Sequence, residues 1–223
     1  ILPRIDAQRA WLQEKASRAL ATEVVIGELQ VQGSWFMPWV QASDVVIFDP
    51  QGHAAVHLPR VVAAVTPWSL VRGSIEQLLI DQPVLDVRRD AQGRLWLAGL
   101  PLPSDEGDTG ASDWLFAQPE FVIRRGRLLW RDEMQPASST GPAHTWVFDD
   151  VDVVLRNPLH HHEFKIDATP PAELSGRLSV RGQLAHAPLH RAGDWRRWSG
   201  QLYAQVPQLD LARWQEGLLR LEA

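Results

Sequence analysis

The sequence contains no cysteine, which excludes disulfide bonds and thiolate chemistry but excludes no cellular compartment. It also lacks any run of about 18 apolar residues, so no membrane-spanning helix is expected within it. Basic residues are in deficit, with 22 Lys and Arg against 27 Asp and Glu and a formal net charge of -5. Because no basic surface is available for phosphates, nucleic acid is not expected as a partner.

The rest of the composition is ordinary for a globular protein. The chain has 223 residues, of which 45% are hydrophobic and 22% are charged, enough to bury a sizeable core. We interpret residues 1–223 as a single module. The chain begins with Ile1 rather than Met, so we interpret it as a fragment of a longer protein.

Short segments with alternating apolar and polar residues dominate the chain. Leu178 and Val180 alternate with Ser179 and Arg181, and the same period of two recurs in 164–168 and 201–206. This period puts apolar side chains on one face of a sheet and polar side chains on the other. Successive strands lie roughly 8 to 20 residues apart without regular helices between them, which favours antiparallel pairing. The sequence therefore predicts a mainly β fold, a twisted antiparallel sheet.

Residues 4–21 are the exception, because Leu12, Ala16 and Leu20 lie near helical spacing there. We expect this helix to cap one end of the sheet and to hide an open sheet edge. Two polar segments, 104–112 and 135–144, are predicted to be mobile loops.

No motif for catalysis is present. The sequence has no G-x-S-x-G element and no phosphate-binding loop of the G-x-x-x-x-G-K type, so an enzyme is not expected. The run His160-His161-His162 suggests a metal site, but adjacent strand residues point to opposite faces and at most two could converge on one ion. We interpret it as a turn with solvated imidazoles. The acidic run 149–152 lacks the glycine of a calcium loop, so no metal is expected.

The 11 tryptophans could stack on sugars or lie at a membrane interface. They are spread along the chain, so we interpret them as filling the ends and seams of a curved sheet. Arginine pairs such as Arg88-Arg89 could hold lipid phosphates, but solvation of the polar face is the simpler interpretation.

The apolar face of the predicted sheet needs a second sheet, a helix or an apolar ligand to cover it. With few helices available, an exposed apolar patch is expected, and such patches mark binding sites. Lipid acyl chains suit a continuous strip, at about 0.8 kcal/mol per buried methylene. A closed sandwich or barrel would need no lipid. The candidate lining residues are Val31, Leu85, Val87, Val151, Val153, Phe164, Ile166, Leu178, Val180, Leu202 and Ala204.

The order of several short motifs resembles the AsmA-like family, specifically the amino-terminal region of YhdP-type proteins. After the predicted helix come V-I-G-E-L at Val25 to Leu29 and V-x-I-x-D-P-x-G at Val45 to Gly52. A D-V-x-R-D-x-x-G-R-L-W-L hairpin follows at Asp86 to Leu97, with F-K-I-D-A-T-P-P at Phe164 to Pro171 and W-S-G-Q-L-Y at Trp198 to Tyr203. Each motif is made of strand and turn residues, and their order and spacing carry the resemblance over nearly the whole chain.

The resemblance implies a protein anchored in the inner membrane of Gram-negative bacteria by one amino-terminal helix, which this chain would lack. The remainder would cross the periplasm as a curved β-sheet groove that conducts phospholipid toward the outer membrane, without catalytic residues or cofactors. The open alternatives are a closed β-domain that acts as an interaction scaffold and recruits envelope proteins, and a carbohydrate-binding domain that uses its tryptophans.

Overall fold

The structure is a computed structural model and shows a mainly β protein. It describes residues 3–20, 22–34, 37–48, 52–64, 66, 75–97, 99–101, 113, 115–134, 145–172, 174–188, 190, 192–194 and 197–207. The two predicted loops, 104–112 and 135–144, lie outside these residues. No helix within the described ranges is both long and apolar enough to cross a membrane.

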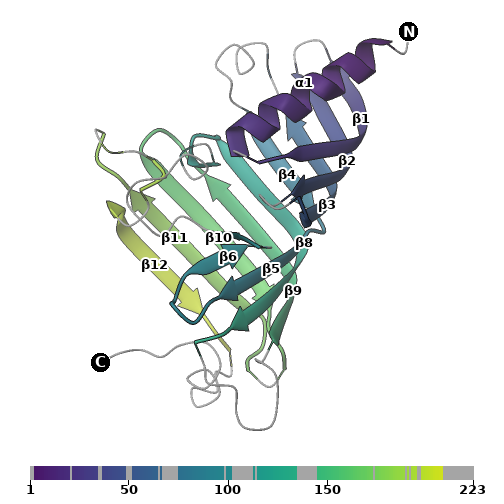
Figure 1. Ribbon diagram of the computed structural model, residues 1–223. Coiled ribbons are helices and arrows are strands. Elements are labelled where there is room, and N and C mark those ends of the chain that lie inside the picture. The colour runs from purple at the N-terminus through teal and green to yellow at the C-terminus, as the bar shows by residue number, and fades with distance from the viewer. Residues whose placement is uncertain are drawn as a thin grey trace.

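The chain begins with one helix and continues as a series of strands. They are α1 (Pro3–Leu20), β1 (Val24–Ser34), β2 (Met37–Phe48), β3 (Ala54–Ala64), β4 (Gln77–Asp81), β5 (Val84–Arg89), β6 (Leu95–Leu97), β7 (Leu100–Pro101), β8 (Glu120–Asp132), β9 (Thr145–Arg156), β10 (His161–Thr169), β11 (Leu178–Ala185) and β12 (Ser199–Gln205). All twelve strands in the described part of the chain belong to one sheet (Figure 1). The predicted fold class and the amino-terminal helix are thus confirmed.

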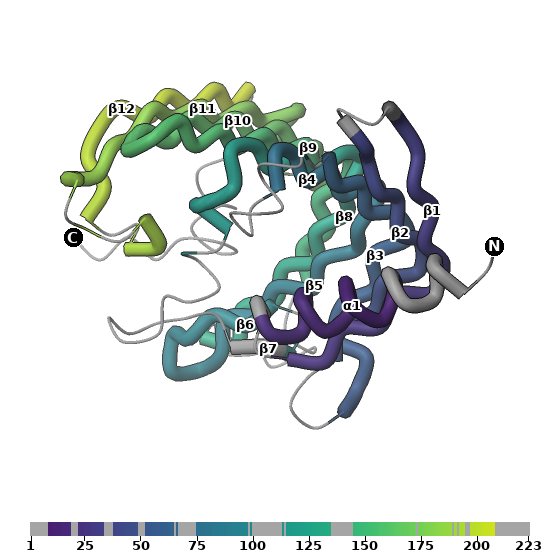
Figure 2. The backbone as a smooth tube through the Cα atoms, turned by 90° about the horizontal axis from the view of Figure 1, so that it is seen from above, coloured from purple at the N-terminus to yellow at the C-terminus, as the bar shows by residue number. Residues whose placement is uncertain are grey.

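The sheet is open and strongly curved. Its hydrogen-bonded order is β1-β2-β3-β4-β8-β9-β10-β11-β12, with β5, β6 and β7 branching from β8. Figure 2 shows that β12 and the β6–β7 arm lie opposite each other across the open side of the curve. Among the described residues, β1 pairs with β2 and β12 with β11, so the two edges do not meet to close a barrel.

The sheet is mixed rather than purely antiparallel, because β4 and β5 both run parallel to β8. Residues 77–81 pair with 120–124, and residues 84–89 pair with 127–132 at the same sequence separation. β4 and β5 therefore follow one another along the same edge of β8, with an interruption at Gln82-Pro83. Beyond these two strands the sheet forks, since β4 continues to β3 and β5 continues to β6. Parallel pairing needs a long crossover, which residues 90–119 supply.

Helix α1 lies along the free edge of β1 and takes the place of a neighbouring strand. The Ser17 side-chain oxygen accepts the backbone N–H of Val24 at 2.9 Å, and Gln13 Oε1 accepts the N–H of Ile26 at 3.0 Å. The spacing of the two side chains along the helix matches that of the two N–H groups along the strand. Four helical residues rise about 6 Å, and two strand residues rise about 6.7 Å. The helix caps this edge as predicted, and it satisfies backbone groups that would otherwise invite another strand.

Two apolar clusters form the core. One lies beneath α1, where Leu12 and Ala16 of the helix pack against strands β1 to β3. The other lies on β8 to β11, where Leu128, Trp130 and Trp146 are among the residues that pack around its buried centre. The buried residues of the first cluster are Val24, Ile26, Leu29, Ala42, Val45, Val56 and Leu58, and those of the second are Phe148, Val151 and Ala168.

Candidate functional site: the apolar inner face

Register assigns each strand residue to one of two faces, because directly opposed residues on paired strands share a face. Ile166 on β10 lies opposite Val180 on β11, which lies opposite Ala204 on β12. On its other side, Ile166 lies opposite Val153 on β9. We call the face that carries these residues the inner face.

The inner face continues from β9 into both arms of the fork. Val153 lies opposite Ile123, and Ile123 lies opposite Ile80, which packs against the cluster beneath α1. On the other arm, Leu85 lies opposite Leu128. All eleven candidates from the sequence, Val31, Leu85, Val87, Val151, Val153, Phe164, Ile166, Leu178, Val180, Leu202 and Ala204, fall on this face. That they contact a lipid stays a prediction.

Exposure varies along the inner face. Val151 is 5% exposed and belongs to the core, whereas Leu202 is 63% exposed and Val31 is 51% exposed. Ile166 and Val180 lie between these limits and are half-buried. The most exposed of these residues therefore lie on β1 and β12, at the two ends of the strand order.

Backbone irregularities keep apolar residues on the inner face where simple alternation would fail. Asp44, Arg125 and Asp150 adopt positive φ values of 52°, 51° and 47°, a conformation that non-glycine residues other than Asp and Asn seldom adopt. Each reverses the alternation of its strand. Ala42 and Val45, three residues apart, consequently both lie in the cluster beneath α1.

The opposite, outer face carries cross-strand ion pairs. Arg127 Nε lies 2.7 Å from Asp149 Oδ1, and Arg177 Nη2 lies 2.9 Å from Asp152 Oδ2. Such exposed pairs contribute roughly 0.2–1 kcal/mol each, so their main effect is to make this face polar. The other cross-strand pairs are Arg88–Glu133, Arg125–Asp81, Arg131–Asp86 and Arg156–Glu120, and a further pair, Lys165–Asp167, lies within β10.

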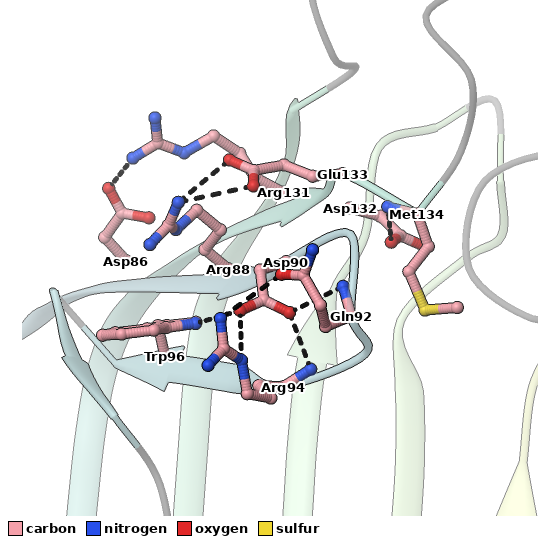
Figure 3. Close-up of polar contacts among 10 residues, drawn as sticks. All are labelled: Asp86, Arg88, Asp90, Gln92, Arg94, Trp96, Arg131, Asp132, Glu133 and Met134. Atoms are coloured by element: carbon pink, nitrogen blue, oxygen red, sulfur yellow. Dashed lines mark hydrogen bonds and ion pairs between the residues drawn. The ribbon is translucent and has the colours of Figure 1, made fainter.

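The arginines considered for lipid phosphates are engaged with carboxylates. Figure 3 shows Arg88 with its Nη1 3.2 and 3.4 Å from the two carboxylate oxygens of Glu133. Arg89 points to the inner face and pairs with Asp132, which is 3% exposed there. This pair lies at the end of the apolar run of β5, and Arg89 neutralises the buried carboxylate of Asp132.

The turn between β5 and β6 is built around the buried carboxylate of Asp90 (Figure 3). It accepts the backbone N–H groups of Gln92 at 3.0 Å and Arg94 at 2.9 Å. It also accepts Arg94 Nε at 2.8 Å and the indole N–H of Trp96 at 2.9 Å. Burial alone would raise the pKa of Asp90, but the hydrogen bonds from Trp96, Arg94 and Gln92 outweigh it and lower this pKa to about 2. These contacts fix the hairpin, a role that the sequence reading missed.

The prediction of solvated imidazoles at 160–162 is wrong for His162. His161 is exposed on the outer face, whereas His162 lies on the inner face with 0% exposure. Its ring stacks on that of Trp198, with centroids 3.7 Å apart and planes inclined by 5°. The ring of Phe116 approaches it edge-on, with centroids 5.7 Å apart. The sequence contains a signal for this position, because the alternation that places Phe164 on the inner face also places His162 there.

Burial dictates the charge of His162. Desolvation, followed by repulsion from His186, His161 and His160, lowers its pKa to about 4, so the ring is neutral at pH 7. His162 Nδ1 lies 2.7 Å from the side-chain oxygen of Asn157. Within the described part of the chain, no three His, Asp or Glu side chains come together to hold a metal ion.

Taken together, the register and the burial define a class of protein: an open, curved β-sheet with an apolar inner face, a polar outer face and one edge sealed by a helix. The model of one family, described as YhdP protein, matches residues 1–223. The chain therefore belongs to the YhdP family. No curated protein sequence matches it.

Proposed function

We propose that this chain is a phospholipid-conducting module of an AsmA-like protein of the YhdP family. In this proposal it stands in the periplasm, attached to the inner membrane through the parent protein, and phospholipid moves along it between the inner and outer membranes. Its role is transport rather than catalysis, and its ligands are acyl chains.

The observation that carries the proposal is the separation of the two faces. Eleven apolar residues from six strands share the inner face, and ion pairs occupy the outer face. Leu202, at 63% exposure, shows that the apolar surface reaches the accessible end of the sheet. Acyl chains need a continuous apolar strip and little directional polar chemistry, and each methylene that leaves water there contributes about 0.8 kcal/mol.

The open sheet speaks against the alternative of a closed β-domain. A closed sandwich or barrel would bury its inner residues against a second layer. Here β1 and β12 remain separate edges among the described residues, so the curved sheet leaves one side open (Figure 2).

Adjacent residues on β12 offer a matched test. Leu202 faces inward and Tyr203 outward, and their exposures are nearly equal at 63% and 65%. A photoreactive amino acid at position 202 of the full-length parent protein should capture phospholipid in cells at least several-fold more than the same probe at position 203. Equal capture from both positions, or none from either, would contradict the proposal.

Substitution by a charged residue at the same two positions tests lipid transfer itself. Leu202→Asp places a carboxylate in the path of acyl chains, and each passing lipid then meets a desolvation cost. We expect it to reduce lipid transfer severely, while Tyr203→Asp retains transfer within about twofold. Thermal melts of both variants control for folding. Because the two sites are almost equally exposed, a difference in lipid transfer without a difference in melting temperature would show that the inner face, and not the outer face, carries the lipid.

A further inference from the structure

We propose that the stacked rings of Trp198, His162 and His186 form an acid-sensitive latch, which holds the connection between β11 and β12 over one end of the inner face. Protonation of His162 releases this connection. The inference concerns regulation of the inner face and in that respect rests on the proposed function, but the latch itself is a property of the fold.

The rings of the latch come from separate segments. His162 lies on β10, His186 and Trp198 lie at the two ends of the β11–β12 connection, and Phe116 lies on the segment that precedes β8. His186 stacks on His162 with centroids 5.1 Å apart, and Phe116 meets Trp198 edge-on at 4.6 Å. These contacts bury the His162 ring completely. They hold the connection to the sheet through apolar ring surfaces.

Hydrogen bonding fixes which nitrogen of each imidazole is free to take a proton. The Asn157 amide donates to the carbonyl oxygen of Gln118 at 2.8 Å, so its oxygen accepts from His162 Nδ1–H. His186 Nδ1 lies 3.0 Å from the carbonyl oxygen of Ala187 and donates to it. In both rings the Nε2 atom therefore carries the lone pair.

Among the described residues, an N–H group formed by protonation of either Nε2 atom would find no hydrogen-bond acceptor. Within the described part of the chain, His162 Nε2, His186 Nε2 and Trp198 Nε1 are buried and have no hydrogen-bond partner. Protonation at Nε2 would create a buried cation whose new N–H finds no acceptor, which is strongly unfavourable.

In the described part of the neighbouring segments, the carboxylates of Asp113 and Asp194 are already engaged. His160 approaches His186 edge-on, with centroids 5.3 Å apart. On the neighbouring segments, Asp113 accepts the backbone N–H of Gly193 at 2.7 Å, and Asp194 pairs with Arg197 at 2.9 Å. Other titratable groups in the described part of these segments include His161 and Glu163 on the outer side of β10 and His190 within the connection.

A cavity of about 330 Å³ that opens to solvent lies next to His162. Its lining includes His162 together with polar residues of the outer face, and Gly200 contributes no side chain to block it. The lining residues are His161, His162, Glu163, Gln183, Leu184, Ala185, Ser199, Gly200 and Gln201.

Hydrogen exchange on the full chain tests the latch without any lipid. With a pKa of about 4 for the closed state and about 6.5 for a solvated imidazole, linkage predicts an open population about 30-fold larger at pH 5 than at pH 7.5. After correction for intrinsic exchange rates, amides of residues 186–198 should lose protection by about that factor, while those of β2 and β3 should not.

Variants decide whether His162 is responsible. His162→Phe keeps an apolar stacking ring that cannot take a proton, and it should abolish the pH response. His161→Phe, the outward neighbour, should retain it. If His162→Phe fails to fold, Trp198→Leu should expose the connection already at pH 7.5. A pH-independent wild-type protein, or a response that survives in His162→Phe, would overturn the latch.

Lipid capture separates this inference from the proposed function. Photocrosslinking to phospholipid vesicles from position 184, which shares the inner face with His162, should rise at pH 5, while capture from position 202 stays constant. Capture from 202 with no change at 184 contradicts the regulatory role and leaves transport standing. Loss of protection at acid pH without capture from either position supports the latch and contradicts transport.

Discussion

The aromatic ring of Phe164 lies against the backbone of Gly182, the residue directly opposite it on β11. A Cβ atom added to Gly182 would lie 2.3 Å from Phe164 Cε1 and 2.4 Å from its Cζ, far closer than van der Waals contact allows. Glycine at this position thus lets a large ring lie flat on the inner face rather than stand away from it.

Gly182→Ala should therefore destabilise the protein. The ring of Phe164 must move, and overpacking of this kind typically costs about 1–3 kcal/mol, measurable as a lower midpoint of urea unfolding. The double variant Gly182→Ala with Phe164→Leu should recover most of the loss, because a smaller side chain makes room for the methyl group. A neutral single variant would show that the close contact imposes no constraint.

Removing the side chains that cap β1 should weaken that edge. Gln13→Ala and Ser17→Ala each leave a partly buried backbone N–H without its partner, at a cost of about 1–3 kcal/mol. Light scattering during mild heating should show earlier self-association, because an open edge is exposed. Arg18→Ala is the control, since its pair with Glu14 is 64% and 63% exposed and should change stability by less than about 0.5 kcal/mol. Equal effects of all three variants would contradict the cap.

Stability should fall in mildly acidic solution through His162. Its pKa in the folded protein, about 4, is below that of the unfolded chain, about 6.5. The unfolded state therefore binds the proton more tightly, and the contribution is fully present above pH 6.5 and lost as pH falls from 6.5 to 4. The loss should approach about 3 kcal/mol. Urea unfolding from pH 8 to pH 4 checks this.

Alanine substitutions distinguish the two neighbouring imidazoles. His162→Ala should cost about 2–4 kcal/mol at pH 7.5, because it leaves a cavity and removes the partner of Asn157. His161→Ala, on the exposed outer face, should stay within about 0.5 kcal/mol. Tolerance of both substitutions would show that the ring stack adds nothing to stability.

The Asp90 carboxylate should titrate near pH 2. Carbon-13 NMR of its carboxyl group provides the measurement. Trp96→Phe removes one of the hydrogen bonds that stabilise the ionised form, so the pKa of Asp90 should rise in that variant. Because the pKa of the folded state is lowered, the contribution of Asp90 to the hairpin is present above its ordinary pKa and is lost as pH falls toward 2. An unchanged titration in Trp96→Phe would contradict the role given to the indole.

Local pattern was sufficient to predict much of the fold. The period of two identified the strands and the inner face, since Ile166 and Val180 alternate with polar neighbours, and the helical spacing of Leu12 and Ala16 identified α1. Both signals arise within a few residues. The predicted capping of a sheet edge followed from the general need to protect open edges.

Nonlocal features escaped the sequence reading. The parallel pairing of β4 and β5 with β8 depends on a crossover whose sequence shows no helical pattern, so nothing in the sequence signalled parallel strands. The reversal of alternation at Asp44 depends on one residue with positive φ, and alternation alone would have placed Val46 rather than Val45 inside. Alternation places His162 on the inner face, but its complete burial depends on Phe116 and Trp198, which are distant in sequence.

The fork at Gln82-Pro83 gives the sheet a mechanical property. The backbone N–H of Gln82 donates to the carbonyl oxygen of Arg124 at 2.8 Å, and the N–H of Arg127 donates to the carbonyl oxygen of Pro83 at 2.9 Å. The junction is thereby hydrogen-bonded to β8 on either side of the interruption, so both arms of the fork are fixed to one strand. We therefore expect a change in the twist of β8 to move both arms together, and the geometry of this junction to set the width of the open side.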